Sequence, residues 1–337
     1  SQDLRVRLSS IEPNHVTDEL IDLVASEPRI CRNFHLPLQN GDDEILARMR
    51  RRYTSSQYAE KVRRCVARIP DLCVGADVTQ ASFLDNFCWA SPDNPQQLGA
   101  LVRAAEGARD AAIGLGVPFI SGKDSFYNQS KDVTGRDLAI PGTLLISALA
   151  PLPDVRKALT MDIKGPGNHL YLVGSTAEEL GGSLYNEILG FVGGAVPEVK
   201  LRLALQNYKS VGTAIAKGLV LSAHDLSEGG LAVAAAEMAF SGEFGLAIDL
   251  DAVARSGGLY SNGFLLFSES PSRLLLEVKP ENEAAFLRCV KGASIKRIGE
   301  SIANPILKVR GLDGLVILEE PLATLKAAWQ TSLPKAL

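Results

Sequence analysis

Apolar positions predict alternating helices and strands from residue 91 onward. Between residues 98 and 113 apolar side chains recur at helical spacing, and Gly114 and Gly116 would end that helix. The apolar run at 117–120 then has the length and composition of a buried strand. The polar pentapeptide at 121–125 follows this strand directly, so we expect the strand to end where the polar side chains begin.

The second half of the chain continues this mixture of periods. We expect strands at 143–149, 169–173, 219–223, 263–267, 274–278 and 315–318. We expect helices at 203–217, 229–240, 281–290 and 321–331, with a short helix after Thr17 and another after Ser183. Because consecutive strands lie between helices, the pattern favours an α+β fold over a strictly alternating parallel one.

Polarity and proline content divide the chain into three expected regions. Residues 1–60 are polar and irregular, as in a linker region. The proline-rich segment 150–154 marks a boundary between an α+β domain at 61–155 and a second α+β domain at 156–337. The chain starts at Ser1 rather than at Met, which favours a fragment of a longer protein.

Composition supports two cores and argues against a polyanion-binding role. With 337 residues and 46% hydrophobic composition, the chain can bury two cores of about 100 to 200 residues each. Lys and Arg number 35 against 39 Asp and Glu, so the net charge of −4 gives no general attraction to nucleic acid or to anionic membranes. Basic residues crowd between Arg48 and Arg68, as on a solvated helix face or a phosphate-binding patch.

Cysteine usage and hydropathy favour a cytoplasmic protein. The five cysteines are odd in number and scattered, without CxxC spacing, which is typical of reduced thiols. No stretch reaches the ~20 continuous apolar residues that span a bilayer, and the N-terminal segment has no apolar signal core. We therefore expect a soluble, cytoplasmic chain.

The first candidate site is the tetrapeptide Gly122-Lys123-Asp124-Ser125. It combines a small residue for close backbone approach with an ammonium, a carboxylate and a hydroxyl, a set that suits a phosphate and its Mg²⁺. The GxxxxGK[ST] spacing of a P-loop occurs nowhere in the chain. A surface turn is the alternative interpretation.

The second candidate site is the expected turn at 224–228, which places His224, Asp225 and Ser227 before a Gly-Gly helix. Amides at a helix N-terminus favour anions, and Asp225 could ligate a metal already neutralised by phosphate. The alternative is a capping arrangement in which Ser227 or Asp225 serves the helix N-terminus. For His224 a hydrogen-bonding role is favoured over general-base work.

The sequence leaves the roles of two further polar segments open. Segment 268–273, SESPSR, would form a hairpin loop between two strands and could contribute polar groups to a cleft. Asp85 and Asn86 could cap a short strand or contact a nucleotide. No catalytic triad can be derived from the spacing of the four histidines and five cysteines, so the catalytic residues are unknown.

Five segments, taken in their order and spacing, carry a resemblance to a known family. They are LDNFCWASPDNP (84–95), PFISGKDSFYNQ (118–129), LGGSLYNEILG (180–190), LVLSAHDLSEGGLAVAAAEMAFSGEFG (219–245) and LLFSESPSRLLLEV (265–278). Together they resemble phosphoribosylformylglycinamidine synthase, of the aminoimidazole ribonucleotide synthetase-like superfamily. The resemblance runs from about residue 74 to the C-terminus, and HDLSEGGL is its most specific piece.

The resemblance places the chain in the C-terminal half of a synthetase built of two tandem α+β halves. It implies an ATP-dependent carbon–nitrogen ligase of the glutamine amidotransferase type, acting in purine biosynthesis. ATP would activate the amide oxygen of formylglycinamide ribonucleotide, and glutamine-derived ammonia would displace the phosphate to form the amidine. The implied partners are a glutaminase domain or subunit and the missing N-terminal half, without which the chain could be inactive.

On matching positions, the resemblance implies roles for seven residues. Asp85, Gly122, Lys123 and Ser227 would bind ATP or ADP, Ser125 would lie beside the substrate, and Asp124 and Asp225 would ligate Mg²⁺. The catalytic His of the family belongs to the first half and has no matching segment in this chain.

One departure and two alternatives stay open. Before the LDN motif the family usually carries a strand with an Asp and a long helix with Glu and Asn, whereas here residues 68–75 run almost directly into the motif. The alternatives are a catalytically silent half that holds a structural nucleotide, and a sister ATP-using enzyme of the same superfamily. Turnover by the isolated chain, or tight ADP binding without turnover, separates the ligase from the silent half.

Overall fold

The computed structural model describes most of the chain from residue 80 onward. The described residues are 17–26, 80–151, 157–253, 255 and 261–331. By packing, the chain divides into two units: Ser1–Ala76 with Leu149–Ala158, and Asp77–Ala148 with Leu159–Leu337. The second unit holds the sheets of the described part of the chain, except for Leu149 at the end of β5.

The first unit contributes one described helix, α1 (Asp18–Ser26). Leu20 donates its backbone N–H to Thr17 Oγ1 at 3.3 Å, which confirms the expected short helix after Thr17. The remainder of the expected linker, the basic run from Arg48 to Arg68 and the expected boundary at residue 155 lie outside the described residues. The domain limits therefore stay expectations.

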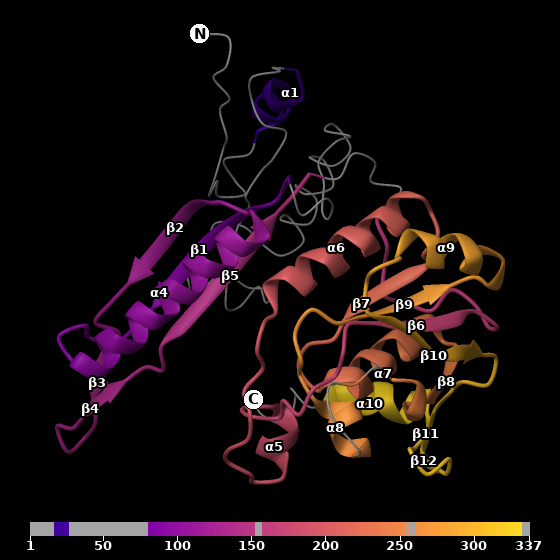
Figure 1. The fold of residues 1–337 in the computed structure, drawn as a ribbon. Coiled ribbons are helices and arrows are strands. Elements are labelled where there is room, and N and C mark those ends of the chain that lie inside the picture. Colours follow the sequence, from indigo (N-terminus) through magenta and orange to yellow (C-terminus); the bar gives the residue numbers. More distant parts are fainter. Residues whose placement is uncertain (1–16, 27–79, 152–156, 254, 256–260, 332–337) are drawn as a thin grey trace. The chain divides into compact units, whose positions relative to one another are not determined.

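A three-stranded sheet, in the order β2-β1-β5, comes first in the second unit (Figure 1). Its strands are β1 (Ser82–Cys88), β2 (Phe119–Ser125) and β5 (Thr143–Leu149). A hairpin of β3 (Gln129–Lys131) and β4 (Asp137–Ala139) lies between β2 and β5 in sequence. The expected strand at 143–149 is confirmed.

Helix α4 (Pro95–Leu115) connects the parallel strands β1 and β2. The Asn94 side chain accepts the N–H groups of Gln96 and Gln97, and Pro95 fills the first helical position. The helix continues through Gly114 and ends at Gly116, whose φ of 69° is the left-handed conformation that glycine adopts without strain. No residue of α4 is buried, so this helix covers little apolar surface in the chain as described.

The polar pentapeptide at 121–125 lies inside β2, which corrects the expectation of a strand that ends before it. Leu84 to Cys88 of β1 pair in parallel with Ser121 to Ser125. Backbone pairing to β1 extends the strand through polar side chains because most of them face solvent. The expected burial of the run at 117–120 holds for Val117 but not for Ile120, which is 45% exposed.

A seven-stranded mixed sheet, in the order β12-β11-β8-β10-β6-β9-β7, forms the larger body of the second unit. Its strands are β6 (His169–Val173), β7 (Ser222–Asp225), β8 (Gly245–Asp249), β9 (Leu274–Val278), β10 (Ile295–Ile302), β11 (Ile306–Arg310) and β12 (Val316–Pro321). Only β8 and β11 pair in parallel within it. The expected α+β class is confirmed.

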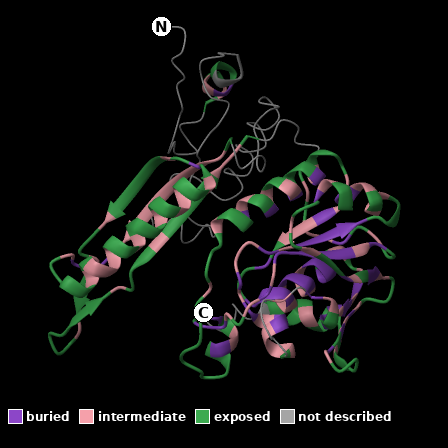
Figure 2. Cartoon of the chain, viewed as in Figure 1, coloured by how far each residue is buried: buried purple, intermediate pink, exposed green. Residues whose placement is uncertain are grey.

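Two cores lie on opposite faces of this sheet. Alternate residues of β6 show this, because Leu170 and Leu172 belong to one core and Tyr171 and Val173 to the other. The first core packs the alanine-rich helix α7 (Gly230–Gly242) with α8 (Asn262–Phe267) and α10 (Leu322–Thr331). The second packs α6 (Leu201–Ala216) and α9 (Glu283–Cys289). Figure 2 shows buried residues gathered in these strands and in α7.

Two expected elements are corrected in this body. Residues 263–267 belong to α8 and not to a strand, and both Leu265 and Leu266 are buried in the core that contains α7. Segment 268–273 is therefore a helix-to-strand loop and not a hairpin. The expected strand at 219–223 lies at Ser222–Asp225, so His224 and Asp225 are strand residues rather than turn residues.

Within the described ranges, no helix is long and apolar enough to cross a bilayer. Cys88 and Cys289 are free thiols, and the other three cysteines lie outside those ranges.

Candidate functional site

Asp225 and Ser227 form a hydrogen-bonded pair where β7 leads into α7. Ser227 Oγ donates to Asp225 Oδ2 at 2.5 Å, and this bond holds the pKa of the Asp225 carboxyl below its ordinary value. Nδ1 of His224 lies 3.3 Å from Asp225 Oδ1, and its Nε2 lies 2.7 Å from Glu237 Oε2 on α7. The Asp225 side chain is 65% exposed, so an ionised carboxylate with a fixed orientation faces solvent.

The capping interpretation of this turn is wrong. The residue that precedes α7 is Gly229, with a φ of 75°, which has no side chain with which to cap the helix. Gly230 also has a left-handed φ, of 62°, and a Cβ on it would lie 2.5 Å from the carbonyl oxygen of Ser268. Asp225 and Ser227 are therefore free of a capping role.

The anion at the start of α7 is the carboxylate of Glu269. Glu269 Oε1 accepts the backbone N–H of Gly229 at 3.0 Å and that of Leu184 at 3.3 Å. Leu184 is the first residue of α5 (Leu184–Ile188), the short helix expected after Ser183. An external phosphate at this turn would meet a negative charge that the protein already supplies, so the expected attraction of helix amides for a ligand anion is offset.

Arg273 is a buried cation beside Glu269. It donates from Nε to Ser270 O at 2.9 Å, from Nη1 to Thr176 Oγ1 at 3.1 Å, and from Nη2 to Ser268 O. Burial lowers the pKa of Arg273 to about 10, against the opposite influence of Glu179 and Glu269. The guanidinium is still charged at neutral pH, and it fixes the loop at 268–273 from inside.

Asp85 and Gly122 meet across β1 and β2. They are register partners, and a Cβ on Gly122 would lie 2.0 Å from Asp85 Oδ1. Side chains alternate between the two faces of a strand, so Asp124 shares a face with Gly122 while Lys123 and Ser125 point to the other. The tetrapeptide at 122–125 is therefore divided between two faces.

Magnesium fits the Asp225 turn on its donor chemistry. Among the described residues, no three His, Cys, Asp or Glu side chains form a group that could hold a metal by themselves. Mg²⁺ commonly takes one or two carboxylates and completes its shell with water and substrate phosphate. Asp225, ionised and exposed beside the Ser227 hydroxyl, would supply one such ligand.

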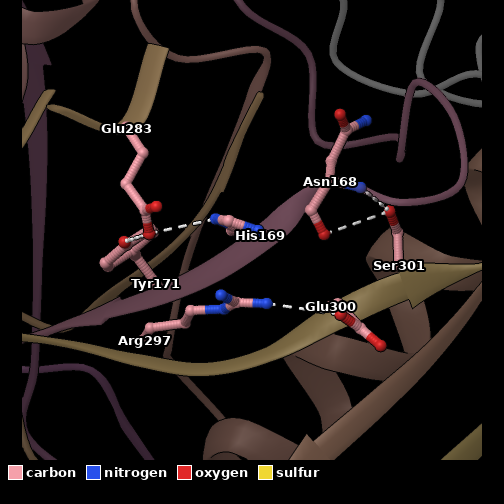
Figure 3. Close-up of polar contacts among 7 residues, drawn as sticks. All are labelled: Asn168, His169, Tyr171, Glu283, Arg297, Glu300 and Ser301. Atoms are coloured by element: carbon pink, nitrogen blue, oxygen red, sulfur yellow. Dashed lines mark hydrogen bonds and ion pairs between the residues drawn. The ribbon is translucent and has the colours of Figure 1, made fainter. Parts of the chain in front are cut away.

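Sequence reasoning missed two polar groups. Glu269 and Arg273 were predicted only as part of a polar loop. The signal that could have revealed them is the presence of an acidic and a basic residue among small residues. Figure 3 shows the second group: His169 Nδ1 lies 3.0 Å from Glu283 Oε1, and the Tyr171 hydroxyl donates to the same oxygen. This group ties α9 to β6.

A shallow cavity of about 210 Å³ lies over β8, β10 and β11 and contains no candidate residue. Its cations are each paired with a carboxylate: Arg297 with Glu300 at 3.3 Å, Lys308 with Glu319 at 2.7 Å, and Arg310 with Asp249 at 3.9 Å. The balanced charges leave no excess for an anionic ligand.

Comparison with known proteins identifies relatives of this chain. Residues 165–311 match the family described as AIR synthase related protein, C-terminal domain. The phosphoribosylformylglycinamidine synthase subunit PurL of Thermomicrobium roseum is 33% identical over 267 residues, which are 77% of this chain and 34% of that protein. The PurL subunit of Alkaliphilus metalliredigens is 33% identical over 255 residues, 75% of this chain and 33% of that protein.

Solved structures agree on the fold. PurL of T. maritima complexed with FGAR aligns with a TM-score of 0.57 at 18% identity, covering 74% of this chain and 40% of that chain. The chain spans about a third of the length of the curated relatives it matches.

Proposed function

We propose that the chain is a part of phosphoribosylformylglycinamidine synthase, because residues 165–311 match the C-terminal domain of AIR synthase related proteins and 267 residues are 33% identical to a PurL subunit of that synthase. The reaction would convert formylglycinamide ribonucleotide to the amidine with ATP and glutamine-derived ammonia. The observation that carries the proposal is the Asp225–Ser227 pair at the β7–α7 turn, inside the matched residues 165–311.

In this proposal the turn binds a nucleotide and its cation. Asp225 is an ionised ligand for Mg²⁺, and the Ser227 hydroxyl, which donates to Asp225, would turn toward a phosphate oxygen. When bound, Mg-ATP supplies the phosphoryl group that activates the substrate oxygen. His224 orients Asp225 through Nδ1 while Glu237 holds its Nε2.

The remaining roles rest on matching positions. Asp85, Gly122 and Lys123 would contact nucleotide, Asp124 would assist the metal, and Ser125 would lie beside the substrate. Parallel pairing places Asp85, Gly122 and Asp124 on one face of the small sheet, which suits a shared nucleotide and metal role for these three. Lys123 and Ser125, on the other face, suit a separate contact.

The proposed partners follow from the same relatives. The PurLQS assembly of Thermotoga maritima is among the solved structures similar to this chain. We propose that a glutaminase domain or subunit supplies ammonia, that an N-terminal synthetase half completes the active site, and that the protein works in the cytoplasm.

A non-catalytic half that holds a structural nucleotide is the second candidate. The observation that favours it is that both ring nitrogens of His224 face carboxylates, so this histidine has no free nitrogen to act as a base at the turn. Such a chain would bind ADP tightly and stay folded better with it, without turnover.

Titration of the whole chain with ADP, with and without Mg²⁺, tests the proposed site. We expect magnesium-dependent binding that Asp225→Asn weakens by more than about tenfold, because the metal loses its charged ligand. Asp137→Asn is the matched control, since its side chain is 64% exposed and lies on the β4 hairpin strand. Equal binding by wild type and Asp225→Asn would remove the turn from the nucleotide site. Turnover with ATP, ammonia and formylglycinamide ribonucleotide, measured on the chain together with the proposed N-terminal half, then separates the ligase from the silent half.

A further inference from the structure

Two glycine-containing loops meet at one carboxylate oxygen. Oε1 of Glu269 accepts the N–H of Gly229, which precedes α7, and the N–H of Leu184, which begins α5. Gly182 and Gly229 have left-handed φ values of 76° and 75°. Both loops therefore turn through left-handed backbone conformations that glycine adopts readily, and the Glu269 carboxylate joins the two loops.

The loop that carries Glu269 is itself anchored at both ends of its polar run. Arg273, which is 1% exposed, donates to the carbonyl oxygens of Ser268 and Ser270 and to Thr176 Oγ1. Ser270 Oγ accepts the N–H of Ala177 at 3.0 Å, and the N–H of Glu269 bonds to the carbonyl of Glu179 at 3.1 Å. Glu269 has little freedom to move relative to the 176–179 segment.

The connection from Glu269 to the candidate site is short. Gly229 lies two residues after Ser227 and four after Asp225, and the N–H of Gly230 bonds to the Ser227 carbonyl at 3.1 Å. The N–H of Leu226 bonds to the carbonyl of Arg273 at 3.1 Å. The turn is therefore held by the 268–273 loop at its beginning and at its end.

We propose that Glu269 is a positioning residue for the nucleotide turn, and that Arg273 fixes Glu269 in that role. Glu269 acts through the Gly229 amide, and it touches neither nucleotide nor metal. The inference rests on the proposed nucleotide site at Asp225 and Ser227. The two acidic residues then have different roles. Asp225 binds the cation, and Glu269 holds the backbone of the turn that carries Asp225.

Glutamine at position 269 distinguishes positioning from ligation. Glu269→Gln keeps an oxygen that can accept both amides but removes the charge, whereas Glu269→Ala removes the acceptor. If Glu269 only positions the turn, Glu269→Gln binds Mg-ADP within about threefold of wild type and Glu269→Ala loses about tenfold or more. If Glu269 ligates the cation, Glu269→Gln loses as much as Asp225→Asn.

Amide hydrogen exchange of the whole chain supplies a readout that does not need a ligand. We expect exchange at Gly229 and Leu184 to accelerate about tenfold or more in Glu269→Ala, but not in Glu269→Gln. Glu300→Ala is the control, because Glu300 lies on β10 and pairs with Arg297. Arg273→Lys should produce a similar acceleration, since one ammonium cannot reach all three acceptors.

The outcomes separate the two proposals. Unchanged exchange in Glu269→Ala, or equal loss of Mg-ADP affinity in Glu269→Gln and Glu269→Ala, would overturn the positioning role. Accelerated exchange together with no Mg-ADP binding by wild type would uphold the loop connection and overturn the nucleotide site that it serves. If Glu269→Ala accelerates exchange and loses Mg-ADP affinity while Glu269→Gln does neither, the result supports both the positioning role and the nucleotide site.

Discussion

The carboxylate of Asp85 lies against the Cα of Gly122 on the neighbouring parallel strand. A Cβ at position 122 would stand 2.0 Å from Asp85 Oδ1 and 2.6 Å from its Cγ, so any side chain there displaces the Asp85 carboxylate. The proposed nucleotide-contacting aspartate thus owes its orientation to a glycine on the adjacent strand.

We expect Gly122→Ala to affect Mg-ADP affinity more than stability. Alanine favours a strand by about 0.5–1 kcal/mol over glycine, and a displaced Asp85 rotamer costs about as much, so the free energy of unfolding should change by less than about 1 kcal/mol. Gly122→Ala should weaken Mg-ADP binding as much as Asp85→Ala, and the double variant should be no worse than either, as titration would show. A lower affinity in Asp85→Ala alone would contradict this relationship.

Two glycines with similar φ values should respond differently to alanine. At Gly230, φ is 62° and a Cβ would lie 2.5 Å from the Ser268 carbonyl and 2.8 Å from that of Leu266. At Gly116, φ is 69° and nothing lies within 4 Å. We expect Gly116→Ala to cost about 1 kcal/mol and Gly230→Ala to cost more than about 2 kcal/mol in chemical unfolding, because only the latter adds a backbone collision to the strain. Equal costs would show that the α7 start can shift freely.

Glu277 should be the most sensitive acid of the seven-stranded sheet. It is fully buried, and its carboxylate accepts the Lys164 N–H at 2.9 Å, Asn168 Nδ2 at 2.7 Å and Ser222 Oγ at 2.8 Å. Glu277→Gln would turn an amide donor toward these donors, and we expect a loss of about 1–3 kcal/mol in the free energy of unfolding.

Glu281→Gln is the matched control for that variant, because the Glu281 side chain is 67% exposed and lies 3.6 Å from Lys279. Its stability should stay within about 0.5 kcal/mol of wild type. A similar cost for both substitutions would mean that the buried donors of Glu277 have other acceptors.

Stability should depend on pH through Glu283. The hydrogen bond from Tyr171, with smaller help from His169 and Arg297, lowers the pKa of the Glu283 carboxyl. A lowered folded-state pKa adds stability above the ordinary Glu pKa of about 4.3, and this contribution is lost as pH falls through the lowered value. The stability difference between wild type and Glu283→Gln should therefore be constant from neutral pH to about pH 5 and shrink below it.

Urea unfolding from pH 7 to pH 3 would measure that difference. Tyr171→Phe removes the main cause of the shift, so Glu283 should titrate closer to its ordinary pKa in that background and the difference should shrink. A difference between wild type and Glu283→Gln that grows toward low pH would have the wrong sign for this explanation.

Local signals in the sequence were enough for elements that carry their own caps or continuous apolar runs. Helix α4 has Asn94, Pro95 and Gly116 at its ends, and β6 is an uninterrupted apolar run, so both were predicted within a few residues. Strands β8, β10 and β11 were not predicted, because their short apolar runs are bounded or interrupted by glycine or charged residues. Pairing with neighbours stabilises these strands, and that information is not local.

The candidate site shows the same division. Asp225 and Ser227 are two residues apart, and the sequence brought attention to them together. The acceptor role of Glu269 joins residues 40 and 85 positions apart, so no local pattern could reveal it. The sequence also did not show which side chains of β2 share a face of the sheet, because the tetrapeptide at 122–125 was expected after a strand rather than inside one.

Strand β12 is the last strand at one side of the seven-stranded sheet in the described part of the chain, and its outer edge exposes Val316 and Ile317. An apolar edge of this kind can recruit a strand from another molecule. Glu319 and Glu320 add charge along it, and Pro321 has no N–H to offer. Charges and proline on an edge strand oppose intermolecular β-pairing, so we expect these three residues to limit the addition of a strand at β12.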